Sequence, residues 1–226
     1  KGIEIQISAT PFKGEFSWET TLSWSKNNNK ILSLANNQNQ LANAKAGTKW
    51  GNVIRNYVGR PMGDMYMLKV IGTFNTEEDL TKYATNGTQG IGDLIFEDYK
   101  KDGTIDVNDY QLVGNYQPDF TFGWTNTFKY KDLDLAVTID GQCGGNVIYA
   151  AARAFSLNRY DDNVLAESGL GRWISPTNTG NGTSHKAGTN NLGSNIGPST
   201  RYLYDADFLR IRNISLGYTL PKKFCK

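Results

Sequence analysis

The most regular pattern in this chain is an alternation of large apolar and polar side chains between residues 120 and 142. Successive side chains of a β-strand point to opposite faces of its sheet, so this period of two predicts a strand on each side of the Lys131-Asp132 break. The predicted apolar face of this hairpin carries Phe120, Phe122, Trp124, Phe128, Tyr130, Leu133, Leu135, Val137 and Ile139. The opposite, polar face carries Thr121, Gly123, Thr125, Thr127, Asp134, Thr138 and Asp140.

Similar alternation occurs near both ends of the chain. Residues 3–7 and 16–25 place Ile, Phe, Leu or Trp on one face, with carboxylates, amides and hydroxyls between them. Residues 208–220 also alternate, but the phase changes near residue 212, which predicts a β-bulge there. Residues 64–74 form a less regular candidate strand. A short helix is predicted within 75–87, where Thr76 and Asp79 have the spacing of a capping box.

The connections between these strands alternate in length. Short links at 10–15, 59–63 and 131–132 take turns with long segments at 26–51, 75–118 and 144–206. Outer-membrane β-barrels have this arrangement, with tight turns on one side of the membrane and long loops on the other. The stretch from 175 to 200 is rich in Asn, Gly, Ser and Thr, which predicts a solvated loop.

Two fold classes produce this pattern of alternation. In a soluble β-sandwich the apolar faces of two sheets pack together, whereas in a transmembrane barrel the apolar face contacts lipid. The aromatic residues near strand ends and the alternating loop lengths favour the barrel. No stretch reaches the ~18 to 20 apolar residues of a membrane helix, while a transmembrane β-strand needs only ~10 alternating residues. The sequence therefore predicts an all-β protein with antiparallel transmembrane strands and long extracellular loops.

Composition excludes several other classes. The chain has 226 residues, 38% of them hydrophobic, and a formal net charge of +2 with dispersed Lys and Arg, so neither disorder nor a nucleic-acid partner is expected. Two cysteines provide neither a disulfide framework nor a zinc cluster. The only histidine, His185, lies in the Gly/Asn/Thr-rich loop with no recognisable nucleophile near it, so it is predicted to be a solvated residue, and no enzymatic activity is expected.

One acidic segment, "DYKKDGTIDVND" at residues 98–109, has the spacing of a calcium-binding loop. Hard cations require several oxygen ligands, and a central glycine permits the turn that brings them together. The candidate Ca²⁺ ligands are Asp98, Asp102, Thr104, Asp106 and Asp109. Lys100 occupies a position where an oxygen ligand belongs, and Asp109 is shorter than the usual Glu. A metal-free turn, in which the Asp side chains bond backbone amides, is the alternative.

Aromatic residues in the long segments allow two interpretations. They could stack on sugar rings or contact a partner protein, or they could form the cores of folded loops. The residues concerned are Tyr149, Phe155, Tyr160 and Trp173.

Several segments follow one another in a characteristic order: "GTFNTEEDLTKYA", "GDLIFEDYKKDGTIDVNDYQLVGNYQPDFTFGWTNTFKYKDLDLAVTIDGQCGGNVIY", "GRWISP" and "TRYLYDADFLRIRNISLGYTLPKK". This succession resembles the C-terminal part of the barrel in the SusC/RagA family of TonB-dependent outer-membrane transporters. A looser match extends to "KGIEIQISATPF", "FSWETTLSWSKNNNKILSL" and "GRPMGDMY". The resemblance implies a barrel of 22 strands with an N-terminal plug, a SusD-like surface lipoprotein as a lid, energy from TonB, and import of oligosaccharides or peptides through the outer membrane.

Against that family pattern, residues 1–226 are expected to be a partial barrel of about seven strands, without the plug, the TonB-contacting segment and the last strands. An open set of strands cannot close a barrel, so this part is not expected to transport alone. The apolar face of 120–139 is expected to contact outer-membrane lipid, and the polar face the lumen or the plug. A soluble β-rich module that binds carbohydrate or protein is the alternative function.

Overall fold

The computed structural model describes residues 1–44, 50–51, 53–156, 163–188 and 197–221. The chain divides into two compact units. The first unit comprises Lys1–Asn29, Gln117–Asn146 and Asp205–Lys226, and the second comprises Lys30–Tyr116 and Val147–Tyr204. The second unit is therefore built from two excursions of the chain, each of which leaves the first unit and returns to it.

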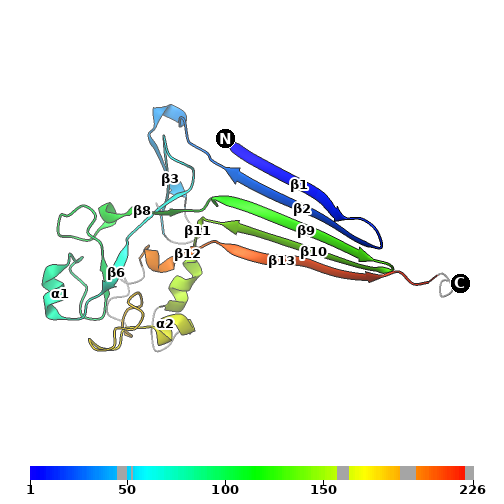
Figure 1. The fold of residues 1–226 in the computed structure, drawn as a ribbon. Coiled ribbons are helices and arrows are strands. Elements are labelled where there is room, and N and C mark those ends of the chain that lie inside the picture. The colour runs from blue at the N-terminus through cyan, green and yellow to red at the C-terminus, as the bar shows by residue number, and fades with distance from the viewer. Residues whose placement is uncertain (45–49, 52, 157–162, 189–196, 222–226) are drawn as a thin grey trace. The chain divides into compact units, whose positions relative to one another are not determined.

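The first unit is a single five-stranded antiparallel sheet with strand order β1-β2-β9-β10-β13 (Figure 1). Each strand has 11 or 12 residues, close to the length that a membrane crossing requires. Their bounds are Gly2–Phe12 (β1), Phe16–Asn27 (β2), Phe120–Tyr130 (β9), Leu133–Cys143 (β10) and Phe208–Tyr218 (β13). The predicted hairpin of residues 120–142 is confirmed, with Tyr130 opposite Leu133 and Lys131 in the left-handed region at φ 53°.

The predicted change of phase near residue 212 is also present. Thr138 pairs with Asn213, but Ile139 pairs with Ile211, so Arg212 is an extra residue in β13. This bulge restores the alternation, because it returns Ile211 and Ile214 to the same face of the sheet.

The second unit consists of short strands and helical turns. A four-stranded sheet has the order β3-β4-β5-β8, and two further pairs, β6 with β7 and β11 with β12, accompany it. The strands are Gln40–Ala44 (β3), Ile54–Tyr57 (β4), Asp64–Met67 (β5), Val70–Thr73 (β6), Leu94–Phe96 (β7), Gln111–Asn115 (β8), Asn146–Ile148 (β11) and Leu203–Asp205 (β12). The α-helices are Glu77–Lys82 (α1) and Ala166–Leu170 (α2), and the 3₁₀ turns are Ala35–Asn37 (η1), Val107–Asp109 (η2), Ala150–Ser156 (η3) and Thr200–Tyr202 (η4).

Helix α1 begins where the sequence predicts it. Thr76 accepts a hydrogen bond from the Asp79 amide, and the Asp79 carboxylate accepts one from the Thr76 amide, so both halves of the capping box are formed. The Asn75 amide also donates to the Asp79 carboxylate, at 2.8 Å, and this bond, together with that from the Thr76 amide, holds the pKa of Asp79 below its usual value.

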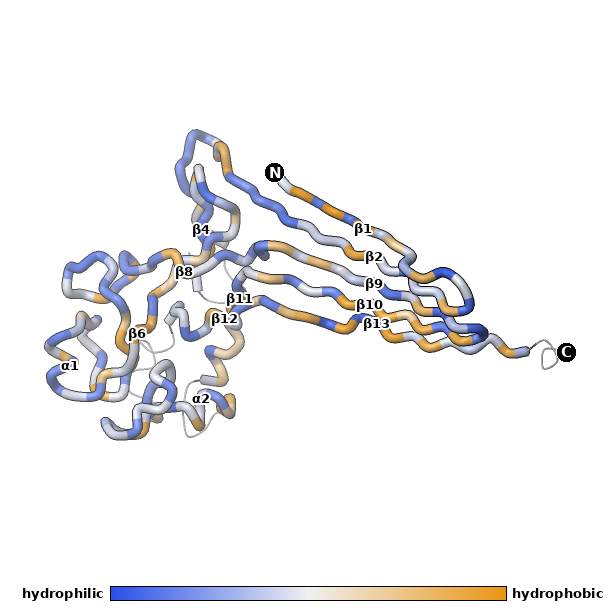
Figure 2. Tube along the Cα trace, viewed as in Figure 1, coloured by the Kyte–Doolittle hydropathy of each residue, from blue (hydrophilic) through white to orange (hydrophobic). Residues whose placement is uncertain are grey.

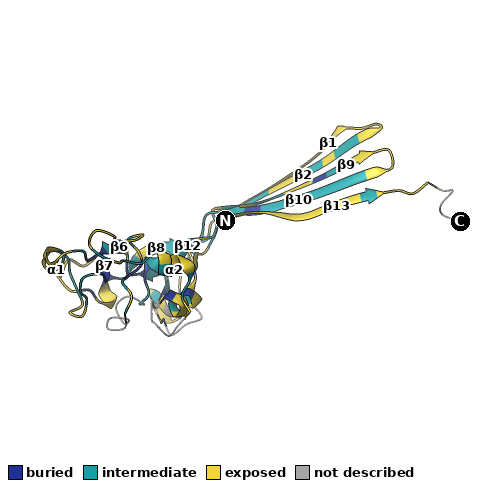
Figure 3. Ribbon diagram, turned by 90° about the horizontal axis from the view of Figure 1, so that it is seen from below, coloured by how far each residue is buried: buried dark blue, intermediate teal, exposed yellow. Residues whose placement is uncertain are grey.

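All the buried hydrophobic side chains among the described residues belong to the second unit. One cluster joins the two excursions, because Trp50, Val53 and Met67 come from the first and Ala152 and Tyr202 from the second. A second cluster lies wholly within the first excursion and contains Leu68, Leu94, Phe96 and Ile105. Figure 3 shows buried residues throughout this unit, whereas the strands of the first unit are coloured mostly as intermediate or exposed.

Three expectations about the long segments need correction. Residues 64–74 are not one strand of the large sheet: they form β5 and β6, which belong to two different small sheets, with Met65, Met67 and Phe74 buried. The short link at 59–63 joins β4 to β5 inside the second unit. The stretch 175–200 is not simply solvated, because Ser184, His185 and Ser199 are buried.

The expectation of about seven strands concerned the barrel wall and stays a prediction; the large sheet itself has five strands. The described residues form thirteen strands, of which five are long and eight have three to five residues. The short strands arise because the long connections fold back on themselves and pair locally, which adds hydrogen-bonded segments without adding length to the large sheet.

Candidate membrane-facing surface

The five long strands bring their large apolar side chains into rows on one face of the sheet. Register places Leu135 beside Phe128 and Leu216, and Phe128 beside Trp18. Ile139 lies in the same way beside Trp124 and Ile211, and Trp124 beside Leu22. The eight residues predicted to face lipid, Phe120, Phe122, Trp124, Phe128, Leu133, Leu135, Val137 and Ile139, all lie in β9 or β10 and share this face by their register.

Among the described residues of the first unit, no second layer of protein covers this apolar face. Ile7, Ile211 and Leu216 expose 59%, 60% and 72% of their surface, and not one large hydrophobic residue of the sheet is buried in the described part of the chain. A contiguous exposed apolar surface of this size indicates a partner such as lipid or protein. The sandwich alternative requires a second sheet over these side chains, and the described residues of this unit contain none.

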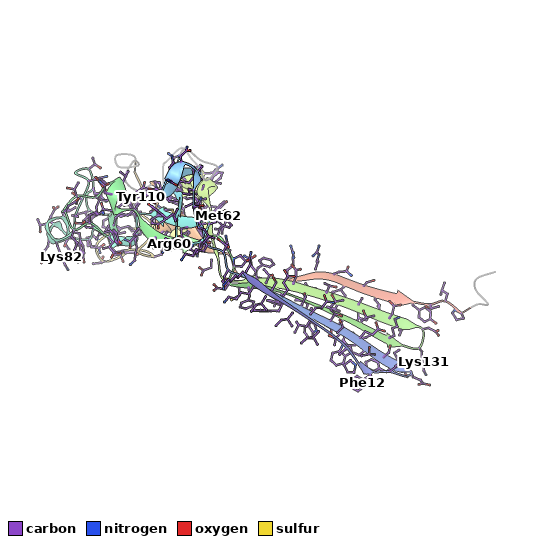
Figure 4. All side chains as sticks on the ribbon, turned by 90° about the horizontal axis from the view of Figure 1, so that it is seen from above. Phe12, Arg60, Met62, Lys82, Tyr110 and Lys131 are labelled. Carbon is purple, nitrogen blue, oxygen red and sulfur yellow. The ribbon has the colours of Figure 1, made fainter. Side chains whose placement is uncertain are left out.

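Aromatic residues gather at both ends of the apolar face. Near the hairpin turns, Phe12, Phe16, Trp18 and Phe128 form a chain of ring contacts with centroids 5.9 to 6.5 Å apart. At the other end, Trp24, Phe120 and Phe122 are linked by centroid distances of 6.0 and 6.4 Å. We call these the turn belt and the loop belt. Figure 4 shows side chains projecting from the sheet, with Phe12 and Lys131 labelled at its turn end.

The spacing of the two belts fits a membrane. Trp18 and Trp24 are six residues apart in β2, which corresponds to about 20 Å along the strand, and Phe16 extends this to about 26 Å. Transmembrane barrels have an apolar band of about 25 Å between aromatic girdles, and their strands are tilted by about 35–45°, so about 26 Å along a strand corresponds to about 20 Å across the membrane. Aliphatic side chains, among them Leu22, Ile139 and Ile214, fill the space between the belts, and hydrophobic segments recur along the strands in Figure 2.

Two indole N–H groups on the apolar face are paired within the sheet. Trp18 Nε1 donates to Asn126 Oδ1 at 3.0 Å, and Trp124 Nε1 donates to Thr20 Oγ1 at 2.8 Å. Water is absent from the hydrocarbon, so unpaired donors there are costly. Asn126 is buried and was missed by the sequence analysis; the signal that could have found it is the missing apolar residue between Trp124 and Phe128, opposite Thr20 in β2.

The opposite face of the sheet is polar and has a depression of about 460 Å³. Its polar lining includes Glu4, Gln6, Ser23, Thr121, Asp140 and Gln142. Arg210 donates to both carboxylate oxygens of Asp140, at 3.2 and 2.6 Å, and so forms a bidentate pair on this face. Gly123 lies in the depression, where a Cβ would come within 2.9 Å of Ser23 Oγ, so the strands are closely packed there.

The carboxylates of the candidate calcium loop are engaged with the backbone. Asp98 accepts hydrogen bonds from the amides of Lys101, Asp102 and Gly103, and Asp109 accepts from Lys100 and Asp106. Asp106 in turn accepts from Asn108, and Asp102 from Thr104. Among the described residues, no group of three or more acidic, His or Cys side chains is arranged to hold a metal ion. This geometry matches the metal-free turn, and calcium binding stays a prediction.

His185 is buried rather than solvated, which corrects the sequence-based expectation. Only 2% of its surface is exposed, and its Nδ1 lies 2.6 Å from the Lys186 carbonyl oxygen. A carbonyl can only accept, so Nδ1 carries the proton. Burial, with the nearby positive charge of Arg201, lowers the pKa of His185 to about 4, which keeps the ring neutral.

The aromatic residues of the long segments do not form one group. Trp173 donates to Asn75 Oδ1 at 2.9 Å inside the second unit, and Tyr149 packs edge-on against Tyr204. Phe155 is exposed, and Tyr160 lies outside the described residues. A separate group lies around β4 and β5, where the Arg55 guanidinium is 5.2 Å from the ring of Tyr66 and 5.4 Å from that of Tyr110. Figure 4 labels Tyr110, Arg60 and Met62 in this unit.

Sequence comparison gives several relatives of this chain. A TonB-dependent receptor of Formosa agariphila is 29% identical over 224 residues, and the TonB-dependent receptor SusC of Bacteroides thetaiotaomicron is 26% identical over 225 residues. These matches cover 98% and 96% of this chain, but 22% and 20% of the relatives. The chain thus resembles the TonB-dependent receptors, SusC among them, over nearly its whole length. It spans about a fifth of the length of its curated relatives, and no family model matches it.

Solved structures show the same fold as this chain. The structure of the RagAB peptide transporter matches this chain with a TM-score of 0.71 at 16% identity. The match covers 99% of this chain and 22% of the matched RagAB chain. The closed-closed state of the RagAB peptide importer matches with a TM-score of 0.67, also at 16% identity. The predicted fold class, an all-β arrangement of antiparallel strands, is confirmed, and the chain shares the fold of part of the RagAB transporter. The described residues include no helix long and apolar enough to cross a membrane.

Proposed function

We propose that this chain supplies part of the wall and the outer loops of an outer-membrane nutrient importer. The observation that carries this proposal is the large sheet, whose exposed apolar face lies between two aromatic belts at the spacing of a bilayer. In this arrangement lipid contacts Phe122, Leu135 and Val137, while the face with Thr121 and Asp134 lines the lumen or meets the plug.

The orientation follows from the lengths of the connections. The turns between β1 and β2 and between β9 and β10 are short, whereas both excursions that form the second unit leave from the opposite ends of the strands. Barrels of this class place short turns in the periplasm and long loops outside the cell. We therefore assign Lys131 to the periplasmic side and the second unit to the extracellular side.

Transport itself is assigned to the full-length receptor. Its relatives are named as TonB-dependent receptors, which supports energy input from TonB through parts of the receptor other than the sheet described above. The solved neighbour is a two-component RagAB assembly, which supports a SusD-like lipoprotein as partner. The ligand would bind between loops, plug and lid, and the second unit would contribute contacts without contributing energy coupling.

The proposed substrates are oligosaccharides or peptides. The solved neighbour is named a peptide transporter, which supports the peptide class, and SusC is named only as a receptor. Growth of a strain that lacks the full-length receptor, supplied in turn with oligosaccharide and with peptide as sole nutrient, tests import. Loss of growth on one of the two identifies the class, and unchanged uptake of both would contradict import by this receptor.

Membrane placement has its own test. Nitroxide labels placed one at a time at Phe122, Leu135 and Val137 of the full-length receptor should be accessible to oxygen in the bilayer. Thr121 and Asp134 directly precede Phe122 and Leu135 in the sequence but lie on the other face of the sheet. Labels at these two positions should be shielded from lipid. The reverse pattern would contradict the assignment of faces.

The competing function is a soluble β-rich module that binds carbohydrate or protein. Cell fractionation separates the two possibilities, because a membrane wall requires detergent for extraction and a soluble module does not. Recovery of the native full-length protein without detergent would favour the module.

A further inference from the structure

A small cavity, partly open to solvent, lies within the second unit, where η3, α2 and η4 approach one another. Its volume is about 20 Å³, and its lining includes Ala152, Ser156, Glu167, Ser168, Arg201 and Tyr204. The lining is mostly polar, with hydroxyl groups, one carboxylate and one guanidinium. A cavity needs roughly 10 to 15 Å³ of such volume to hold one water molecule, so this space suits a single water.

The guanidinium of Arg201 is only partly satisfied by protein. Its Nη2 donates to the Ser156 carbonyl at 3.3 Å, while its buried Nη1 has no hydrogen-bond partner among the described residues. Burial lowers the pKa of Arg201 from its ordinary value, which reflects the cost of holding this charge away from solvent. A buried donor on a charged group that stays unpaired is destabilising, so a partner for Nη1 is expected in the cavity.

Glu167 provides the matching negative charge at the same cavity. It lies at an exposed position in the first turn of α2, on the open side of the cavity, and its charge favours the protonated form of Arg201. The two side chains do not form a direct ion pair in the described part of the chain. Two opposite charges that line one water-sized cavity without touching have the arrangement of a water-bridged pair.

We propose that this cavity binds one water molecule, which accepts a hydrogen bond from Arg201 Nη1 and donates one to the Glu167 carboxylate. The surrounding hydroxyls offer the further bonds that buried waters typically make. Ser156 already bonds the Tyr202 hydroxyl at 3.0 Å, so the water completes a polar network that joins all three helical segments. The bridge therefore fastens the part of the second excursion before residue 170 to the part that leads into β12.

An experimental structure of the full-length receptor at a resolution that shows waters tests this directly. We expect one density peak within hydrogen-bond distance of both Arg201 Nη1 and a Glu167 oxygen. An empty cavity would overturn the proposal. Crystals grown in bromide provide the second arm: an anomalous peak at the site would identify an anion instead of water and would also overturn it.

Substitutions test the water through hydrogen exchange in the full-length receptor. Ala152→Val adds two methyl groups to the cavity wall, whereas Ala151→Val makes the same change at an exposed position of the same turn. Displacement of the water should speed exchange of the Tyr202 amide about tenfold, because a charged donor loses its partner, and the control should leave the rate unchanged. In a receptor that already carries Arg201→Met, Ala152→Val should change the exchange rate of the Tyr202 amide less, because the charged donor is gone. Equal changes with and without Arg201→Met would show that Ala152→Val acts only by overpacking, which would contradict the bound water.

Discussion

Trp18 and Asn126 are joined across β2 and β9 by an indole-to-amide hydrogen bond of 3.0 Å, on a sheet face that is otherwise almost wholly apolar. The bond explains how an asparagine can lie between the two aromatic belts. It also means that the indole of Trp18 does not need the membrane surface to satisfy its N–H. The turn belt can therefore extend into the hydrocarbon without an unpaired donor.

The first prediction concerns this pair. Asn126→Ala in the full-length receptor should lower the unfolding free energy in lipid by about 1 to 3 kcal/mol, because Trp18 Nε1 loses its acceptor. Trp18→Phe combined with Asn126→Ala should cost less than the sum of the two single changes. Guanidinium unfolding in vesicles measures all four proteins, and additive effects would show that the two side chains are not coupled in the membrane.

The second prediction compares neighbouring positions on opposite faces of β10. Val137→Arg should destabilise the receptor by about 2 to 4 kcal/mol, because Val137 lies between the two belts, where lipid contact is proposed. Ala136→Arg, on the polar face beside Thr127 and Ser215, should have a much smaller effect. Yield of folded receptor in the outer membrane and unfolding in vesicles provide the measurements. Equal penalties at both positions would be inconsistent with lipid on only one face.

The third prediction is a pH dependence in the second unit. The folded-state pKa of His185 is about 4, below the unfolded value of 6.5, so the unfolded chain binds more protons between these values. Stability should therefore fall as the pH drops from about 6.5 towards 4, by at most about 3 kcal/mol. Hydrogen exchange of residues near His185, measured across this range, should show the slope, and His185→Asn should flatten it. A slope that persists in the variant would assign it to other groups.

The fourth prediction concerns the acidic loop at 98–109. Asp109 is fully buried and accepts from two backbone amides, whereas Asp102 is exposed and accepts from one, so Asp109→Ala should destabilise the loop far more than Asp102→Ala. Because the carboxylates are already engaged with amides, isothermal titration of the receptor with millimolar Ca²⁺ should give no binding heat. A saturable heat that Asp98→Asn abolishes would establish the calcium site instead.

The large sheet and helix α1 could be predicted from sequence, because the patterns that indicate them lie in residues close together along the chain. A period of two marks β9 and β10, a change of phase marks the bulge at Arg212, and a capping box marks α1. In each case residues close in sequence determine the conformation. The role of Asn126 could not be predicted, because the gap that it leaves in the apolar row does not reveal its hydrogen-bond partner Trp18, which lies on β2.

The second unit could not be predicted in this way. Its core residues, among them Trp50, Met67 and Tyr202, follow no regular spacing and are brought together by contacts between distant segments. The Leu68 amide donates a hydrogen bond to the Pro198 carbonyl, and the Val70 amide donates one to Thr200 Oγ1. The composition of 175–200 is that of a solvated loop, yet its partners in the first excursion bury His185 and Ser199. Hydropathy along the chain does not record such pairings.

The core that joins the two excursions constrains how receptors of this kind can diversify. Met67 and Tyr202 pack in one cluster, although in the sequence the hairpin of β9 and β10 lies between them. Replacing one outer loop with that of a related receptor would leave half of a hydrophobic core without its complement. Chimaeras designed to transfer ligand preference should therefore exchange both excursions of the second unit together.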